Sequence, residues 1–442
     1  MVSKIKNLAR RQLQGEAGGV FRGMITLAMG AGLARILGIA SIPILTRLYS
    51  PDDYGVLAVY TSIVAVLVPI LTFRYVTAIP LPKTDAMAFN LFVLCAKLIA
   101  FGTLLIALTL GLFGHTVLGW FSMEELAPYW WLIAIGVMGT ATYELFSMWA
   151  TRKKDYKVIA KTQFGQSLLG NVIKIGLGLL AIKPLGLVFG QIVAQSGGIG
   201  SYVKKAAKDF KSGWPSLSNK KQKLLASYYQ DFPKYRLPSQ FLMVLSAQAP
   251  VLMMAGLYGK TQTGQLGLAM MALSLPVGLI GGAMGRAYYA EVAAIGKSDF
   301  PKIWRLTLTV QRNLFIVGLP AAIFLMLWAK PIFAFFFGTE WETAGLYASY
   351  FSIFTLLQFT SNPLVQVLNV VGSQVVFLLI NIARTIGYIF IYYIANYLRL
   401  DDDGFVMLLA SYLSLYYLVM TLLILLMVKQ AAAQSKGNNN AG

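Results

Sequence analysis

The hydrophobic residues of this chain occur in long runs that are separated by short polar segments. A run of about 20 apolar residues is long enough to cross the hydrocarbon core of a membrane as a helix. The alternation of apolar and polar positions over about 10 residues that marks a membrane strand is not seen. The pattern predicts an all-α integral membrane protein with twelve transmembrane helices. Their expected ranges are 23–45, 55–79, 87–113, 128–150, 162–182, 185–203, 238–258, 264–285, 305–328, 344–370, 374–397 and 404–428.

The charged residues indicate how these helices are oriented. Of the 442 residues, 57% are hydrophobic and 12% are charged, yet the net charge is +20. Most Lys and Arg fall in alternate loops, whereas the opposite loops are short and acidic, as at Asp401-Asp402-Asp403. Basic loops remain on the cytoplasmic side of a membrane. We therefore expect both termini to be cytoplasmic, and the positive charge to reflect membrane orientation and not nucleic-acid binding.

One long basic loop divides the runs into six and six. The expected parts are a cytoplasmic N-terminal segment, a six-helix lobe, a basic cytoplasmic linker, a second six-helix lobe and a polar cytoplasmic tail, at residues 1–22, 23–203, 204–237, 238–428 and 429–442. The later part of the linker mixes basic, aromatic and aliphatic residues. This mixture predicts a helix at the inner membrane interface that is attracted to anionic lipid. A solvated basic linker is the alternative.

Basic residues within the apolar runs are the main candidates for a binding site. An ionisable group inside a bilayer costs about 2.5–3.5 kcal/mol on insertion scales, so such residues tend to be functional. Asn171 and Asn381 each lie one turn before one of these residues, on the same helical face. The four basic residues nearest the middle of a run are Arg35, Lys97, Lys174 and Arg384.

The sign of these charges indicates the cargo. Arginine presents a planar fork that fits phosphate or carboxylate oxygens, and lysine acts as a point charge. The set therefore predicts a cationic cavity for a phosphate-bearing cargo. The alternative is that the long side chains reach the interface from inside a helix.

Two further charged residues lie closer to the ends of runs. Arg74 is near the inner end of the second run, where an interfacial position or the mouth of a cavity would suit it. Glu144 is the only carboxylate in the predicted spans. It is expected either to form an ion pair with Lys97 or Arg74, or to bind a coupling H⁺ or Na⁺.

Signatures of enzymes are missing from the sequence. The only histidine, His115, is in a short outer loop, and there is no nucleotide-binding Walker A motif. We expect no catalytic residue, no metal site and no cofactor other than a coupling ion. The single cysteine, Cys95, lies in an apolar run, so no disulfide framework is expected.

Several segments, in their order along the chain, resemble those of a known family. They are LTRLYSPDDYG followed by RYVTAIPLPK within residues 45–91, DFPKYRLPSQ at 231–240, and SLPVGLIGGAMGRAYYAEVA at 274–293. In these segments the chain resembles bacterial polysaccharide flippases of the O-antigen translocase type. That family belongs to the superfamily that includes multidrug-and-toxin-extrusion antiporters and the lipid II flippase.

The resemblance implies a two-lobed, ion-coupled exporter in the bacterial cytoplasmic (inner) membrane. Its cargo would be an undecaprenyl-pyrophosphate-linked oligosaccharide, moved from the cytoplasmic to the periplasmic leaflet for O-antigen, capsule or exopolysaccharide synthesis. A polymerase and a chain-length regulator of the same pathway would be partner proteins.

Two other functions compete with this one. A multidrug antiporter of the same architecture would handle mostly cationic drugs and favour carboxylates in its cavity, whereas the apolar runs here are rich in basic residues. A polysaccharide polymerase or ligase would need a larger outer loop than any in this sequence.

Overall fold

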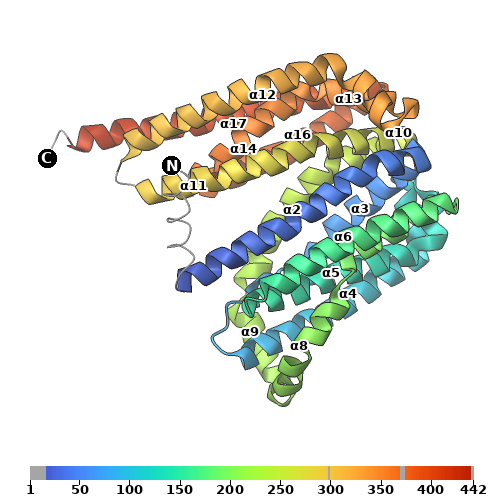
Figure 1. Cartoon of the computed structure of the whole chain (residues 1–442), viewed down its shortest axis with the longest axis vertical. Coiled ribbons are helices and arrows are strands. Elements are labelled where there is room, and N and C mark those ends of the chain that lie inside the picture. Colours follow the sequence, from blue (N-terminus) through green and yellow to red (C-terminus); the bar gives the residue numbers. More distant parts are fainter. Residues whose placement is uncertain (1–15, 297–298, 369–373, 440–442) are drawn as a thin grey trace, which may run out of the picture. The chain divides into compact units, whose positions relative to one another are not determined.

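Helices make up nearly all of the chain (Figure 1). The computed structural model describes residues 16–296, 299–368 and 374–439, and no strand occurs in these ranges. The chain divides into two compact units, one ending at Val244 and the other beginning at Leu245.

The first unit is built from long helices and a set of short ones. α2 packs along α6, α6 along α7, and α4 along α5. The elements are α2 (Glu16–Leu48), α3 (Pro51–Leu71), η1 (Tyr75–Ala78), α4 (Asp85–Gly119), η2 (Glu124–Tyr129), α5 (Trp130–Arg152), α6 (Tyr156–Leu179), α7 (Leu185–Ser196), α8 (Ile199–Gly213), η3 (Trp214–Ser216), α9 (Asn219–Tyr228) and η4 (Phe232–Arg236).

The second unit begins within a helix that starts in the first. In this unit α12 packs against α13, α14 and α17. The elements are α10 (Leu237–Pro276), η5 (Val277–Gly281), α11 (Gly282–Ile295), α12 (Phe300–Phe337), η6 (Thr339–Trp341), α13 (Glu342–Tyr350), α14 (Ser352–Leu364), η7 (Val365–Val367), α16 (Gln374–Tyr397) and α17 (Asp402–Asn439).

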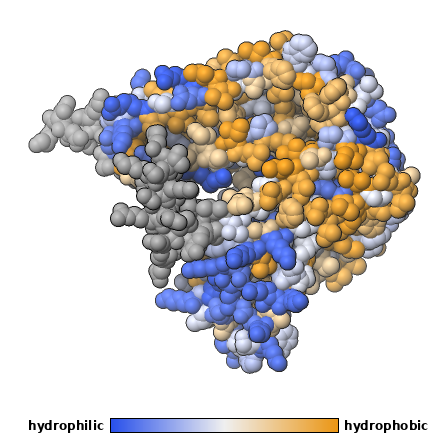
Figure 2. Space-filling view, in the orientation of Figure 1, coloured by the Kyte–Doolittle hydropathy of each residue, from blue (hydrophilic) through white to orange (hydrophobic). Residues whose placement is uncertain are grey.

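The outer surfaces of the long helices are strongly apolar. Seven helical segments in the described ranges are long and apolar enough to cross a membrane. Large hydrophobic side chains such as Leu112 on α4 and Phe335 on α12 are about three-quarters exposed, and Figure 2 shows broad hydrophobic areas over the helices. A soluble protein rarely exposes such continuous apolar surface. The chain is therefore a multi-pass membrane protein.

The predicted apolar runs all contain helix in the described ranges, but several of their boundaries were wrong. The run predicted at 55–79 is α-helical only to Leu71, and a turn at residues 72–74 separates it from η1. The helix predicted at 87–113 continues to Gly119, so His115 lies in a helix and not in the predicted loop. The run predicted at 185–203 is interrupted, because Gly198 has a φ of 102° and separates α7 from α8. The run predicted to end at 285 continues as helix to Ile295. The twelve-span count and the cytoplasmic termini remain predictions, and residues 1–15, 369–373 and 440–442 lie outside the described ranges.

A single glycine separates the two helical segments of α10. Gly259 has φ 79° and ψ −171°, a conformation that is essentially restricted to glycine. A Cβ atom added at this position would have no heavy atom within 4 Å. Any cost of replacing Gly259 therefore comes from the backbone and not from packing.

Gly259→Ala is expected to lower the free energy of unfolding by about 1–3 kcal/mol. Thermal unfolding of the detergent-solubilised protein measures this. Gly38→Ala is the matched control, because Gly38 is helical and equally uncrowded, and alanine favours a helix. Equal stability of the two variants would show that the break at Gly259 does not need glycine.

Candidate functional site

The second unit contains a cavity of about 460 Å³ beside η5, α11 and α14. Gly278, Gly281, Gly282 and Gly285 form one wall, and their spacing places them on one face of the helix. Because glycine has no side chain, this wall leaves space next to the helix backbone. The remaining lining residues are Val277, Arg286, Tyr289, Asn362 and Gln366.

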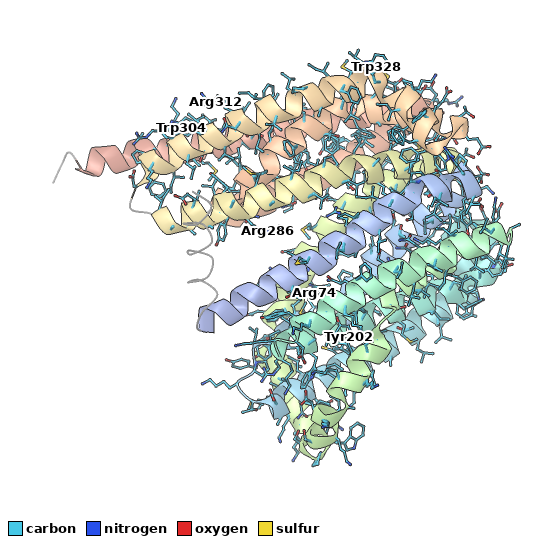
Figure 3. The ribbon with its side chains drawn as sticks, viewed as in Figure 1. Arg74, Tyr202, Arg286, Trp304, Arg312 and Trp328 are labelled. Carbon is cyan, nitrogen blue, oxygen red and sulfur yellow. The ribbon has the colours of Figure 1, made fainter. Side chains whose placement is uncertain are left out.

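Among the described residues, Arg286 is the only charged side chain that lines this cavity. Its side chain is exposed and forms no ion pair with any carboxylate in the described ranges. One guanidinium nitrogen lies 3.8 Å from the point where a Cβ of Gly282 would be, so the guanidinium lies along the glycine wall. Figure 3 labels this residue on α11.

The other polar groups of the cavity are uncharged. Asn362 and Gln366 are four residues apart on α14 and η7, and Tyr289 follows Arg286 by three residues. The cavity thus offers one cation, two amides and a phenol, with no carboxylate. This chemistry suits an anion carried by a molecule that also has hydroxyl groups.

The sequence did not predict Arg286 as a site residue. The predicted helix ended at 285, which assigned Arg286 to a loop. The signal that would have identified it is the glycine pattern in VGLIGGAMGR, because it places four small residues on the same face of a helix next to an arginine.

Arg35 is exposed on α2. No hydrogen bond or ion pair of its side chain occurs with the described residues. Its neighbour Ala34 accepts a hydrogen bond from Ser167 of α6 through its carbonyl oxygen, at 2.8 Å. Arg35 therefore remains available to a ligand.

Lys174 is buried inside the first unit. Its ammonium donates to Oε1 of Gln191 on α7 at 2.7 Å, and its side chain packs so closely on Gly190 that a Cβ there would lie 2.3 Å from it. The carbonyl of Lys174 accepts a hydrogen bond from Tyr49 at 2.7 Å. Asn171, one turn earlier, is only partly buried. The contacts of Lys174 are those of a residue that joins helices.

Lys97 binds the linker region. Its ammonium donates to Oδ1 of Asn219 at 3.0 Å and to Oε1 of Gln222 at 2.9 Å, and both residues belong to α9. The lysine thus connects α4 to a helix of the predicted linker. Its charge is met by two amide oxygens.

Arg74 and Glu144 form an ion pair. The guanidinium of Arg74 donates to Oε1 of Glu144 on α5 at 3.0 Å, and the two side chains are 11% and 24% exposed. Arg74 follows α3 and has a φ of 61°, and Phe73 before it has a φ of 46°. Left-handed conformations are uncommon for residues other than glycine. The partner of Glu144 is thus one of the two that the sequence left open.

Arg384 lies among tyrosines in the second unit. Its guanidinium carbon is 5.9 Å from the ring centre of Tyr416, within range of a cation–π contact, and its carbonyl accepts a hydrogen bond from Tyr412 at 3.0 Å. Asn381, one turn earlier, accepts a hydrogen bond from Thr385 through its carbonyl. Neither Arg384 nor Asn381 lines the cavity at Arg286.

The fold is that of a known class of membrane transporters. A structure of lipid II flippase MurJ matches with a TM-score of 0.68 at 12% identity, over 93% of this chain and 90% of that one. A multidrug resistance MATE family transporter of the MOP superfamily matches with a TM-score of 0.63 at 15% identity, over 92% and 98%. A Vibrio cholerae MATE transporter, VcmN, matches with 0.56 at 15%, over 94% and 97%.

The amino-acid sequence shows which family the chain belongs to. The model of the polysaccharide biosynthesis protein family matches residues 44–346, which is more than half of the chain. The chain belongs to this family. A comparison with curated protein sequences gave no match. The matched segment contains Arg286 and the whole glycine wall.

Glu144→Gln and Arg74→Gln are each expected to lower the free energy of unfolding by about 3 kcal/mol, because each leaves the other charge without its partner in a poorly hydrated place. The double variant should lose less than the sum of the two, with a coupling of about 1 kcal/mol or more. Thermal unfolding of the four proteins gives this coupling.

The exposed pair between Lys330 and Glu342, whose charged atoms are 3.3 Å apart, is the control. Glu342→Gln should change stability by less than about 1 kcal/mol. Additive losses at Arg74 and Glu144 would contradict a direct energetic link between them.

Proposed function

We propose that the chain moves a lipid-linked oligosaccharide across the bacterial inner membrane. The cargo is an undecaprenyl-pyrophosphate-linked repeat unit, carried from the cytoplasmic to the periplasmic leaflet for O-antigen, capsule or exopolysaccharide synthesis. The observation that carries the proposal is the cavity of Arg286, cationic and free of carboxylates, in a member of the polysaccharide biosynthesis family. One structure with the same fold is named a lipid II flippase.

The cavity has the groups that such a cargo needs. The fork of Arg286 can donate two parallel hydrogen bonds to phosphate oxygens. The amides of Asn362 and Gln366 can both donate to and accept from sugar hydroxyls. The glycine wall allows a bulky headgroup to approach the helix backbone. The prenyl chain needs no polar site, because it remains in the lipid.

Transport against a gradient requires an energy source. We assign this to an H⁺ or Na⁺ gradient, with Glu144 as the carboxylate that a coupling ion would reach. In this proposal the ion competes with Arg74 for Glu144, because Arg74 already binds Oε1 of that carboxylate. Alternating access would occur in a chain of twelve spans with both termini in the cytoplasm.

Arg286→Ala is expected to reduce translocation of labelled lipid-linked oligosaccharide in proteoliposomes by roughly tenfold or more, since a hydrogen bond to a charged group contributes about 1.5–3 kcal/mol. Arg286→Lys should retain part of the activity, because it keeps the charge and loses the fork. The amount of folded protein in each preparation is checked by its thermal unfolding.

Arg305→Ala is the matched control for this assay. Arg305 is an exposed arginine on α12 that does not line the cavity, so translocation should be unchanged. Full activity of Arg286→Ala would mean that this cavity does not hold the charged headgroup.

A further inference from the structure

Residues 199–236 of the first unit form a basic platform made of α8, η3, α9 and η4. This segment contains eight Lys, one Arg and two Asp, so its net charge is +7. Figure 2 shows a hydrophilic area in the lower part of the view, where Figure 1 places α8 and α9.

The inner side of the basic platform is fixed to the long helices. Asn90 of α4 donates to the carbonyl of Ser216 at 3.0 Å and accepts from the backbone of Ser218 at 2.9 Å. Tyr75 donates to the carbonyl of Ala226 at 3.0 Å. With the bonds from Lys97 to α9, these contacts join η1 and α4 to the platform. Because its inner side is held in this way, the platform presents a fixed set of residues on its outer side.

One of the two acidic residues of the platform already has partners. Asp209 accepts from the indole of Trp149 at 3.4 Å and forms an ion pair with Lys153 at 3.4 Å. Burial lowers the pKa of Lys153, but the hydrogen bonds and charges of Asp85 and Asp209 outweigh burial and hold the pKa above its usual value. This carboxylate is thus neutralised by the long helices and does not offset the platform lysines.

The outer face of α9 combines positive charge with exposed apolar surface. Lys220, Lys223, Leu224, Ser227 and Tyr228 follow a helical spacing on one face and are all exposed, whereas Gln222 and Leu225 face inward and are buried. Such a face, basic and apolar together, is typical of helices that lie in the interface of an anionic membrane.

The same combination extends over the rest of the platform. The aromatic and aliphatic side chains of Trp214, Leu224, Tyr228 and Tyr235 are 66–76% exposed, and tryptophan and tyrosine are enriched at the level of lipid headgroups. On α8, Lys204, Lys208 and Lys211 are exposed on the side opposite the buried Tyr202 and Ala206. No ion pair joins these three lysines to a described carboxylate.

We infer that the basic platform binds anionic lipid headgroups at the inner surface of the membrane, with its exposed aromatic side chains inserted at headgroup level. The charge provides the preference for anionic lipid, and the apolar side chains provide contact with the bilayer. Since the platform is bonded to η1 and α4, bound lipid would hold the first unit at a fixed depth. This role is independent of the cargo that the chain carries.

The test places a fluorescent label on the outer face of α9 in the full chain. Ser227→Cys is labelled in a Cys95→Ser background, because Cys95 is the only cysteine. The protein is reconstituted in nanodiscs of phosphatidylglycerol and phosphatidylcholine, with brominated acyl chains on one lipid or on the other. Bromine quenches the label, so the ratio of the two quenching values reports which lipid is enriched beside α9.

Quenching by brominated phosphatidylglycerol is expected to exceed that by brominated phosphatidylcholine by roughly threefold or more, and high salt should reduce the ratio. Replacing Lys204, Lys208, Lys220 and Lys223 by Gln should bring the ratio close to one. The control replaces four exposed lysines outside the platform by Gln, namely Lys157, Lys161, Lys302 and Lys429. This variant should keep the quenching ratio of the unsubstituted protein.

A ratio of one in the protein with all its lysines overturns the inference. So does a ratio that the platform substitutions leave unchanged. A label that neither brominated lipid quenches means that the outer face of α9 stays in water. The basic platform is then a solvated linker or binds an acidic protein, and both outcomes contradict lipid binding.

Discussion

The structure depends on one constraint, which is that a charge or polar group in an apolar environment needs a partner or a polar space. A chain that is mostly apolar can hold few ionisable groups away from water, because each costs free energy unless it is compensated. The described helices satisfy this in two ways. Arg74, Lys97 and Lys174 bind oxygen atoms of other elements, and Arg286 lines a cavity.

This distinction divides the basic residues of the apolar helices into two groups. Lys174 and Lys97 join helices through hydrogen bonds to amide oxygens. These contacts lie within the first unit, and a role of either lysine in binding a ligand stays a prediction. Arg286 has no such contact, because its guanidinium lies along the glycine wall and forms no ion pair with a described carboxylate. An arginine that lies beside a cavity and pairs with no carboxylate of the described residues suits an anionic ligand.

The helical membrane fold could be predicted from the sequence because the constraint acts on local composition. Runs of apolar residues must be helical when no water can bond the backbone, and the structure describes helix in each of them. Boundaries were less predictable. The break at Gly198 depends on a backbone conformation, and the extension of α11 to Ile295 crosses polar residues that resembled a loop.

The partners of individual charges could not be predicted, because they depend on which helices lie side by side. Gln191 is 17 residues from Lys174, and Gln222 is 125 residues from Lys97. For Glu144 the sequence left three alternatives open: an ion pair with Arg74, an ion pair with Lys97, or the binding of a coupling ion. Arg286 was missed for a different reason, since its importance follows from the glycines next to it and not from its position in an apolar run.

The proposed transport depends above all on the binding of phosphate by the guanidinium of Arg286. The most direct measurement is the equilibrium binding of undecaprenyl-pyrophosphate-linked oligosaccharide to the purified chain, compared with the same prenyl oligosaccharide without its phosphates. We expect the pyrophosphate form to bind more tightly, and Arg286→Ala to remove most of that difference while leaving the binding of the phosphate-free form unchanged. A difference that persists in Arg286→Ala, or no difference in the unsubstituted protein, would contradict the account.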